Sequence, residues 1–389
     1  MVPFIAFLFI ASFLLLNLPP LDAQVGVCYG RRGNNLPGPR QVVELYKQYN
    51  IKSMRLYDPD QATLQAVQGT NIKLMLGVSN EDIEPIGCYP SIADTWVRTN
   101  VVPYASSIKY IAVGNEIEPS DPQAPHMVQA MQNIVNALNS HNLGNQIIVS
   151  TAINMDLVQN TYPPSHAEFK DLSYITPIIK FLLDYDWPLF VNIEPYATYM
   201  NDPKNIPLDF ALFTSCGYKF IDDKTKLGYQ NLFDAQYDAV WFAAWKVGLS
   251  IENQQNGRQL RPQISKSRMN GQRQVRQPFT GETGWSKGFS HGMSRSTTHN
   301  NNVDGQRNAC GYPKHGELGT MENAEIFYKN MINHVKKGTP LSQGYELEVF
   351  LFAMFDENLK TGDESEKHYG LFTPDGRSKY GILNFCVDQ

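Results

Sequence analysis

The stretch IKYIAVGNE, residues 108–116, decides how this chain folds. Its first six residues are rich in β-branched and aromatic side chains, which predicts a strand buried on both faces. The strand ends with an amide, Asn115, and a carboxylate, Glu116. Because carboxylates are rarely buried without a partner or a function, Glu116 is a candidate functional residue. The alternative is an ordinary strand-end residue that caps the next helix.

Seven other segments have a strand-like composition and alternate with helical patterns. In chain order they are 25–30, 53–59, 73–78, 146–151, 188–193, 279–282 and 349–355. Strands that alternate with helices favour a parallel sheet, and eight such units in a chain of this length fit a closed barrel. We therefore predict an α/β protein whose residues 24–389 form one (β/α)8 TIM barrel.

Polar residues follow several of these predicted strands. They are Tyr57, Glu116, Asn192, Glu282 and Glu357. In a (β/α)8 barrel the chemistry collects at the carboxyl ends of the strands, so these residues are expected to meet. Two carboxylates from two strand ends are the minimum that hydrolysis of a glycosidic bond requires. The chain has no G-x-G-x-x-G or P-loop motif, which argues against a nucleotide-dependent enzyme.

Residues 1–23 have the features of a secretory signal peptide. An apolar stretch at 4–16 is followed by prolines and small residues that end at Ala23. The stretch is too short for a comfortable membrane span, although a retained signal anchor is the alternative. We therefore expect a protein secreted to the extracellular space or cell wall.

Charge and cysteine content limit the class of partner. Cleavage after Ala23 would leave a net charge of −4, which argues against nucleic acid or a membrane as the main partner. The five cysteines fit neither a zinc site nor a dense disulfide scaffold, and Cys28 is expected to be a buried thiol. We expect a monomer without cofactor or metal.

Six motifs resemble plant endo-β-1,3-glucanases, which form family 17 of the glycoside hydrolases. They are VGVCYGRRGNNLP at 25–37, MRLYDP at 54–59, AVGNEI at 112–117, NLFDA at 231–235, LFAMFDEN at 351–358 and EKHYGLF at 366–372. The resemblance covers residues 25 to about 248 and about 321 to 385. It implies a (β/α)8 barrel that cleaves β-1,3-glucan internally with retention of configuration.

The resemblance also implies roles for individual residues. Glu116 would be the proton donor and Glu282 the nucleophile, while Asn115 would hydrogen-bond the sugar 2-hydroxyl. Other residues expected to bind the β-glucan substrate are Tyr57, Asn192, Tyr196, Trp285, Glu357, Lys360 and Glu366. For the two tyrosines the alternative is packing, and for the last three residues it is a surface ion-pair cluster.

The chain departs from the family pattern at two places. The family has Tyr-Pro-Tyr-Phe after strand six, whereas this chain has Glu194-Pro195-Tyr196-Ala197, so an additional carboxylate enters the cleft. Polar insertions at about 248–277 and 286–319 flank Glu282. We expect these insertions to be disordered surface loops, because they have too few apolar residues to offset the entropy of ordering. A basic loop that reaches acidic wall polymers is the alternative.

These departures leave other functions open. A glucan-binding protein on a glucanase scaffold would bind the polymer without cleaving it, because a displacement of 1 Å at the nucleophile can cost ~100-fold in rate. A hydrolase of another β-glucan, such as the mixed-linkage polymer, is also open, because linkage choice depends on the shape of the cleft.

Overall fold

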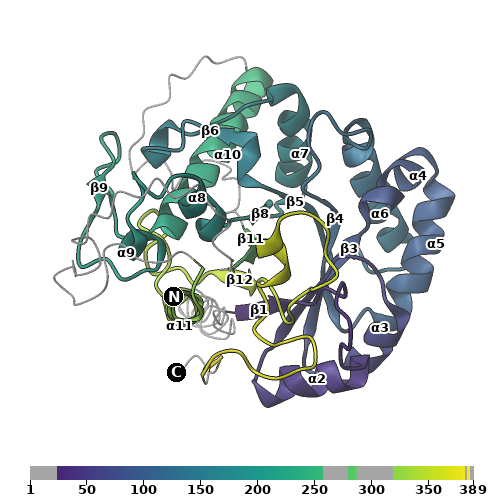
Figure 1. Ribbon diagram of the computed structural model, residues 1–389. Coiled ribbons are helices and arrows are strands. Elements are labelled where there is room, and N and C mark those ends of the chain that lie inside the picture. Colours follow the sequence, from purple (N-terminus) through teal and green to yellow (C-terminus); the bar gives the residue numbers. More distant parts are fainter. Residues whose placement is uncertain (1–23, 257–278, 285, 287–318, 382, 386–389) are drawn as a thin grey trace, which may run out of the picture.

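The computed structural model of the protein describes residues 24–256, 279–284, 286, 319–381 and 383–385. Its centre is a closed barrel of eight parallel strands surrounded by helices (Figure 1). The strands are β1 (Gln24–Cys28), β2 (Ser53–Leu56), β3 (Lys73–Val78), β4 (Ile108–Asn115), β5 (Ile148–Ile153), β8 (Phe190–Asn192), β11 (Phe279–Thr283) and β12 (Glu348–Leu351). The predicted (β/α)8 TIM barrel is therefore confirmed.

The barrel closes because its first strand pairs with its last strand. Val25 of β1 is opposite Val349 of β12, and Cys28 at the other edge of β1 is opposite Arg55 of β2. The interior of the barrel is filled by a small cluster that includes Met75, Tyr110 and Phe190, all of them nearly inaccessible to solvent. A larger apolar layer lies between the strands and the surrounding helices.

The helices that cover the barrel follow the strands in chain order. They are α2 (Pro39–Gln48), α3 (Gln61–Val67), α4 (Ile83–Cys88), α5 (Pro90–Asn100), α6 (Met127–Ser140), α7 (Leu172–Tyr185), α8 (Pro195–Asn201), α9 (Leu208–Ala211), α10 (Leu232–Asn256) and α11 (Met321–His334). Each presents an apolar face to the barrel; Met127, Ala130 and Ile134 of α6, for example, are buried. Asp171 caps α7 by accepting a hydrogen bond of 3.0 Å from the Tyr174 amide.

Of the eight barrel strands, only β3 has the limits predicted from the sequence, and most of the others are shorter than predicted. The fifth is displaced toward the C-terminus and covers Ile148–Ile153 instead of 146–151. The eighth stops at Leu351 although the apolar run continues to Phe355. The reason is competition for backbone partners, because the amides of Ala353 and Asp356 donate to the carbonyls of Tyr369 and Phe372. The C-terminal segment therefore binds some of the amides in this part of the chain, while those of Phe352 and Met354 still donate to Thr283 of β11 and Cys28 of β1.

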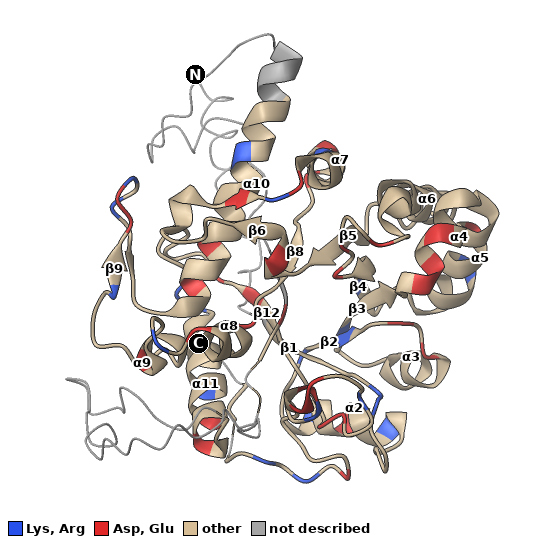
Figure 2. Cartoon of the chain, turned by 45° about the horizontal axis from the view of Figure 1, so that its top comes forward, with Lys and Arg blue, Asp and Glu red and all other residues tan. Residues whose placement is uncertain are grey.

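Charged residues of both signs are scattered over the helices and loops, as Figure 2 shows. Exposed charges are screened by salt beyond about 10 Å, so the electrostatics of any cleft depend on the residues that line it. Among the described residues, none of the helices has the length and apolar character needed to cross a membrane.

Candidate active site

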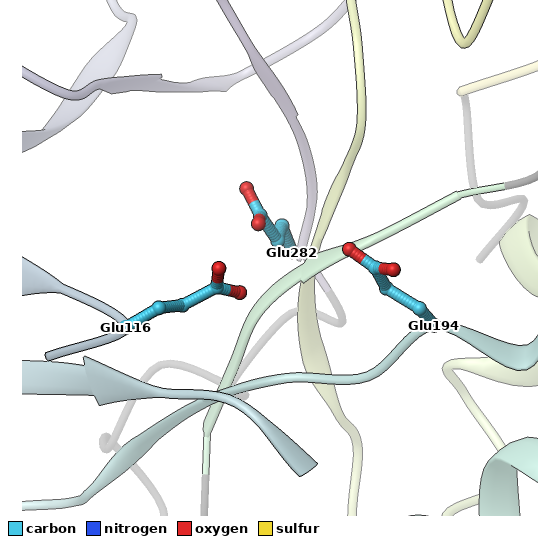
Figure 3. Close-up of side chains that lie close together, drawn as sticks. All are labelled: Glu116, Glu194 and Glu282. Carbon is cyan, nitrogen blue, oxygen red and sulfur yellow. The ribbon is translucent and has the colours of Figure 1, made fainter. Parts of the chain in front are cut away.

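An open cleft of about 780 Å³ lies over the carboxyl ends of the barrel strands. Glu116 enters it directly after β4, Glu282 enters it from β11, and Glu194 enters it shortly after β8. Their side chains converge from three sides (Figure 3), and one oxygen of each lies within 4.8 Å of the others. The two carboxylates predicted to act on the substrate are therefore brought together with Glu194, the additional carboxylate expected in the cleft.

Glu116 reaches the cleft because the backbone turns sharply at the end of β4. Gly114 has φ 70° and Glu116 has φ 57°, both in the left-handed region. A residue other than glycine in that region is uncommon and costs of order 1–3 kcal/mol, and such residues cluster at functional sites. Asn80 fixes the turn, because its side chain accepts from the Asn115 amide at 2.8 Å and donates to the Asn115 carbonyl at 3.0 Å.

The ionisation of Glu116 is shifted toward the acid form. Burial and then the negative charge of Glu282 raise the pKa of Glu116 to about 7, while a hydrogen bond from Asn192 and the charge of Arg55 act in the opposite direction. Asn192 donates that bond to Oε1 of Glu116 at 2.7 Å. Near neutral pH, Glu116 can therefore both hold and release a proton, as a general acid/base must.

The Glu282 carboxylate has a different environment. The hydroxyl of Tyr57 donates a hydrogen bond to its Oε2 oxygen. The same oxygen lies 3.5 Å from Nη1 of Arg55, whose side chain is only 1% exposed. A hydroxyl donor and a buried positive charge are thus both directed at the Glu282 carboxylate.

Arg55 links the two sides of the site. Its Nη2 donates to Oδ1 of Asn115 at 2.6 Å, and its Nη1 donates to Oδ1 of Asn192 at 3.0 Å. Since Asn192 donates in turn to Glu116, one buried guanidinium positions both carboxylates through a continuous network. Charge-assisted hydrogen bonds of this kind are stronger and geometrically more restrictive than neutral ones.

A second group of charges follows β12. Lys360 lies 2.8 Å from Glu366 and 4.0 Å from Glu357, measured between Nζ and a carboxylate oxygen. The Arg32 amide donates to Glu357 at 2.9 Å, and all four residues line the cleft. These residues thus form ion pairs and also one wall of the cleft, and their role in substrate binding stays a prediction.

Two of the residues predicted to bind substrate, Asn192 and Tyr196, do not line the cleft. Asn192 is buried beneath the carboxylates and is not among the residues that line the cleft. Tyr196 is also not brought to the cleft; it lies in α8 with 3% exposure and packs edge-to-face against Tyr369. That placement favours the packing alternative for Tyr196. Trp285 lies outside the described residues, as do most of the two polar insertions.

The sequence reasoning did not assign roles to Arg55, Asn80 or Glu194. The sequence contains a feature that marks each of them. Arg55 is a cation within a strand whose residues are all buried. Asn80 closely follows the end of β3, and Glu194 closely follows β8. Cys28 is a buried thiol, as predicted, and burial raises its pKa to about 12. It is therefore not a nucleophile at neutral pH.

A closed (β/α)8 barrel with paired carboxylates at the carboxyl ends of its strands is the arrangement that a glycoside hydrolase needs. Comparison with protein families supports this class. Residues 25–252 and 307–385 match Glycosyl hydrolases family 17, and the chain belongs to this family. Glu116 lies in the first matched range, whereas Glu282 lies between the two ranges, where the barrel itself positions it.

Similar proteins are known from several plants. The chain is 42% identical to a glucan endo-1,3-beta-glucosidase of Vitis vinifera, over 98% of this chain and 97% of that protein. It is 40% identical to glucan endo-1,3-beta-glucosidase A of Solanum lycopersicum, over 92% of each. The family resemblance seen in the sequence motifs is thus confirmed.

Solved structures show the same fold. The β-1,3-glucanase and allergen CJP38 of Cryptomeria japonica pollen is 34% identical, with a TM-score of 0.75 over 94% of this chain and 100% of that one. A structure from a study of two plant β-glucan endohydrolases with distinct substrate specificities is 33% identical, with a TM-score of 0.75 over 92% of this chain and 99% of that one.

Proposed function

We propose that this protein hydrolyses internal β-1,3-glucosidic bonds of β-1,3-glucans with retention of configuration. The observation that carries the proposal is the close approach of Glu116 and Glu282, since one oxygen of each carboxylate lies within 4.8 Å of one oxygen of the other. Retaining glycosidases have carboxyl groups about 5–5.5 Å apart, whereas inverting ones need about 6.5–9.5 Å to admit a water molecule. The names of the plant relatives support β-1,3-glucan as the substrate.

The proposed mechanism has two steps. Glu282 attacks the anomeric carbon while Glu116 gives its proton to the departing glycosidic oxygen, so the bond breaks and a covalent glucosyl–enzyme ester forms. The Glu116 carboxylate then takes a proton from water, whose oxygen displaces Glu282 from the anomeric carbon. Each step inverts the configuration, so the product retains it. Arg55 and Tyr57 hold the attacking carboxylate in position.

Asn115 is the proposed contact to the sugar 2-hydroxyl. Its Oδ1 oxygen already accepts hydrogen bonds from Arg55 and Asn192. The Nδ2 amide is therefore the group left to donate to a substrate hydroxyl, and this fixes the direction of the bond. Such a bond strengthens as positive charge develops on the sugar ring.

Digestion of a soluble β-1,3-glucan, followed by proton NMR, tests the proposal. The first product should carry a β-configured reducing end, and new reducing ends should appear faster than free glucose. Binding of the insoluble polymer without release of reducing ends would instead support a non-catalytic glucan-binding protein. Faster cleavage of a mixed-linkage β-glucan would reassign the substrate.

The activity should decline as the pH rises through about 7. The pKa of Glu116 is raised to about 7, chiefly by burial, and the leaving oxygen receives its proton only from the acid form. Above that pH, kcat/KM should fall with a slope that approaches about tenfold per unit. Measurement between pH 5 and pH 9 on a soluble β-1,3-glucan checks this. Constant activity up to pH 8.5 would show that Glu116 is not the acid.

We also propose that residues 1–23 are removed as a signal peptide and that the protein is secreted. Cleavage after Ala23 would leave β1 intact, because that strand begins at Gln24. N-terminal sequencing of the extracellular protein should then begin at or near Gln24, and a membrane-bound protein that keeps Met1 would contradict the proposal. Residues 248–256 of the first insertion form the end of α10, so the expectation of a disordered loop is wrong for that part. For the rest of 248–277 and for 286–319 it stays a prediction from the sequence.

A further inference from the structure

Glu194 is the one member of the three-carboxylate group to which the proposed mechanism gives no role. It precedes α8 as its N-cap residue, but its side chain makes no capping hydrogen bond. The backbone of Glu194 is fixed instead by two hydrogen bonds to its carbonyl oxygen, which accepts from the amide and from the hydroxyl of Thr198, both at 3.1 Å. The carboxyl group is thus directed into the cleft by a fixed backbone (Figure 3).

The surroundings of Glu194 are mostly acidic. It faces Glu116 from β4 and Glu282 from β11, and from the segment after β12 it faces Glu366, Lys360 and Tyr369. Among the described residues, no hydrogen bond or ion pair to its carboxyl oxygens is present. By contrast, Glu282 has Tyr57 and Arg55 as partners, and Glu116 has Asn192.

Three carboxylates this close cannot all be ionised without a large repulsion, and the group with the fewest partners keeps its proton longest. Burial and then the charges of Glu282, Glu116 and Glu366 raise the pKa of Glu194 to about 8, while Lys360 acts in the opposite direction. At neutral pH the group is therefore a carboxylic acid, which has one hydrogen-bond donor and an acceptor oxygen.

We propose that Glu194 is a substrate-binding residue, which as a neutral acid donates a hydrogen bond to a hydroxyl of a glucosyl unit at the scissile bond. A sugar seated against Glu116 and Glu282 also reaches Glu194, because oxygens of all three lie within 4.8 Å of one another. The sugar excludes water from the acidic cluster, so the bound state favours the protonated form further. This inference rests on the proposed function, since it assumes a β-1,3-glucan in this cleft.

Proton uptake on binding is the measurement that separates this role from a structural one. In the Glu116→Gln variant, where hydrolysis is suppressed, a β-1,3-linked glucose hexamer is titrated calorimetrically at pH 8 in buffers of different ionisation enthalpy. Binding should take up about half to one proton, because ionised Glu194 must be protonated in the complex. The double variant Glu116→Gln/Glu194→Gln should take up none and still bind, since the amide keeps a donor and an acceptor.

Two further variants complete the test. Glu194→Leu in the same background should bind the hexamer about tenfold more weakly at pH 6, because both hydrogen-bonding groups are lost. The matched control is Glu84→Gln, an equal change at an exposed position of α4, which should leave proton uptake unaltered. Equal uptake with and without Glu194, equal affinity of the Leu and Gln variants, or no binding of the hexamer would overturn the proposal.

The outcome is independent of the test of hydrolysis. If the wild-type protein does not cleave β-1,3-glucan but the Glu194-dependent proton uptake is observed, the proposed function fails and the role of Glu194 in binding stands. If cleavage is observed and the uptake does not depend on Glu194, only the present inference fails. Thermal unfolding of each variant confirms that the fold is retained.

Discussion

Glu116→Gln should reduce kcat on β-1,3-glucan by about 10²–10⁴-fold, the usual contribution of a general acid. Glu282→Gln should lose more, because the amide cannot form the covalent intermediate on which both chemical steps depend. Both replacements keep the size of the side chain, and in the first variant the new amide oxygen can still accept the hydrogen bond that Asn192 gives to Oε1 of Glu116. Initial rates of reducing-end release measure the effect.

The two variants should differ on a substrate with a good leaving group. A β-1,3-linked oligomer that carries dinitrophenol needs little help from an acid, so Glu116→Gln should still release dinitrophenol in a rapid first turnover. Glu282→Gln should release none, because the nucleophile itself is missing. If the Glu282 variant kept the burst and the Glu116 variant lost it, the two roles would be reversed.

Arg55→Met should destabilise the protein by about 3–5 kcal/mol, the cost of removing one partner from a buried ion pair. Methionine fills much of the same space, so the loss reports charge and hydrogen bonding more than volume. Glu282 would lose its only ion-pair partner among the described residues, and Asn115 and Asn192 would each lose a donor. Unfolding in urea, followed by circular dichroism, measures the change.

A double-mutant cycle separates the ion pair from the rest of the network. Arg55→Met/Glu282→Gln should recover part of the stability that Arg55→Met loses, because no buried negative charge is then left without a partner. Arg40→Met, an equal change at an exposed position of α2, should stay within about 0.5 kcal/mol of wild type. A double variant as unstable as the sum of the single variants would exclude coupling between Arg55 and Glu282.

The barrel could be predicted from sequence because its strands are short apolar runs with clear ends. The third is the simplest example: it begins at the exposed Lys73 and ends at Val78, before Ser79-Asn80-Glu81, and the structure has the same limits. The eighth was predicted too long, because an apolar run does not reveal which backbone its amides will choose. Phe352 to Phe355 are apolar enough for a strand, yet the backbone here divides its hydrogen bonds between the neighbouring barrel strands and the segment that contains Tyr369 and Phe372.

The site was predictable where a polar residue follows a strand directly, as at Glu116 and Glu282. It was not predictable where the orientation of a side chain decides the role. Arg55 and Tyr57 are two residues apart, and only the closed barrel directs both toward Glu282. Tyr196 is one position after Pro195 in α8, and the turn of that helix directs it to the core and away from the cleft.

The hydrogen-bond network around Arg55 has a consequence for how activity is acquired during folding. Its members come from β2, β4, β8 and β11, which are far apart along the chain and become neighbours only in the complete barrel. Pairing of distant segments is slow and cooperative, because the loop entropy must be overcome before the contacts form. A chain that has folded only its first half would have Arg55 and Glu116 but no nucleophile. Hydrolysis of the polymer by this protein therefore begins only after the last strands have docked.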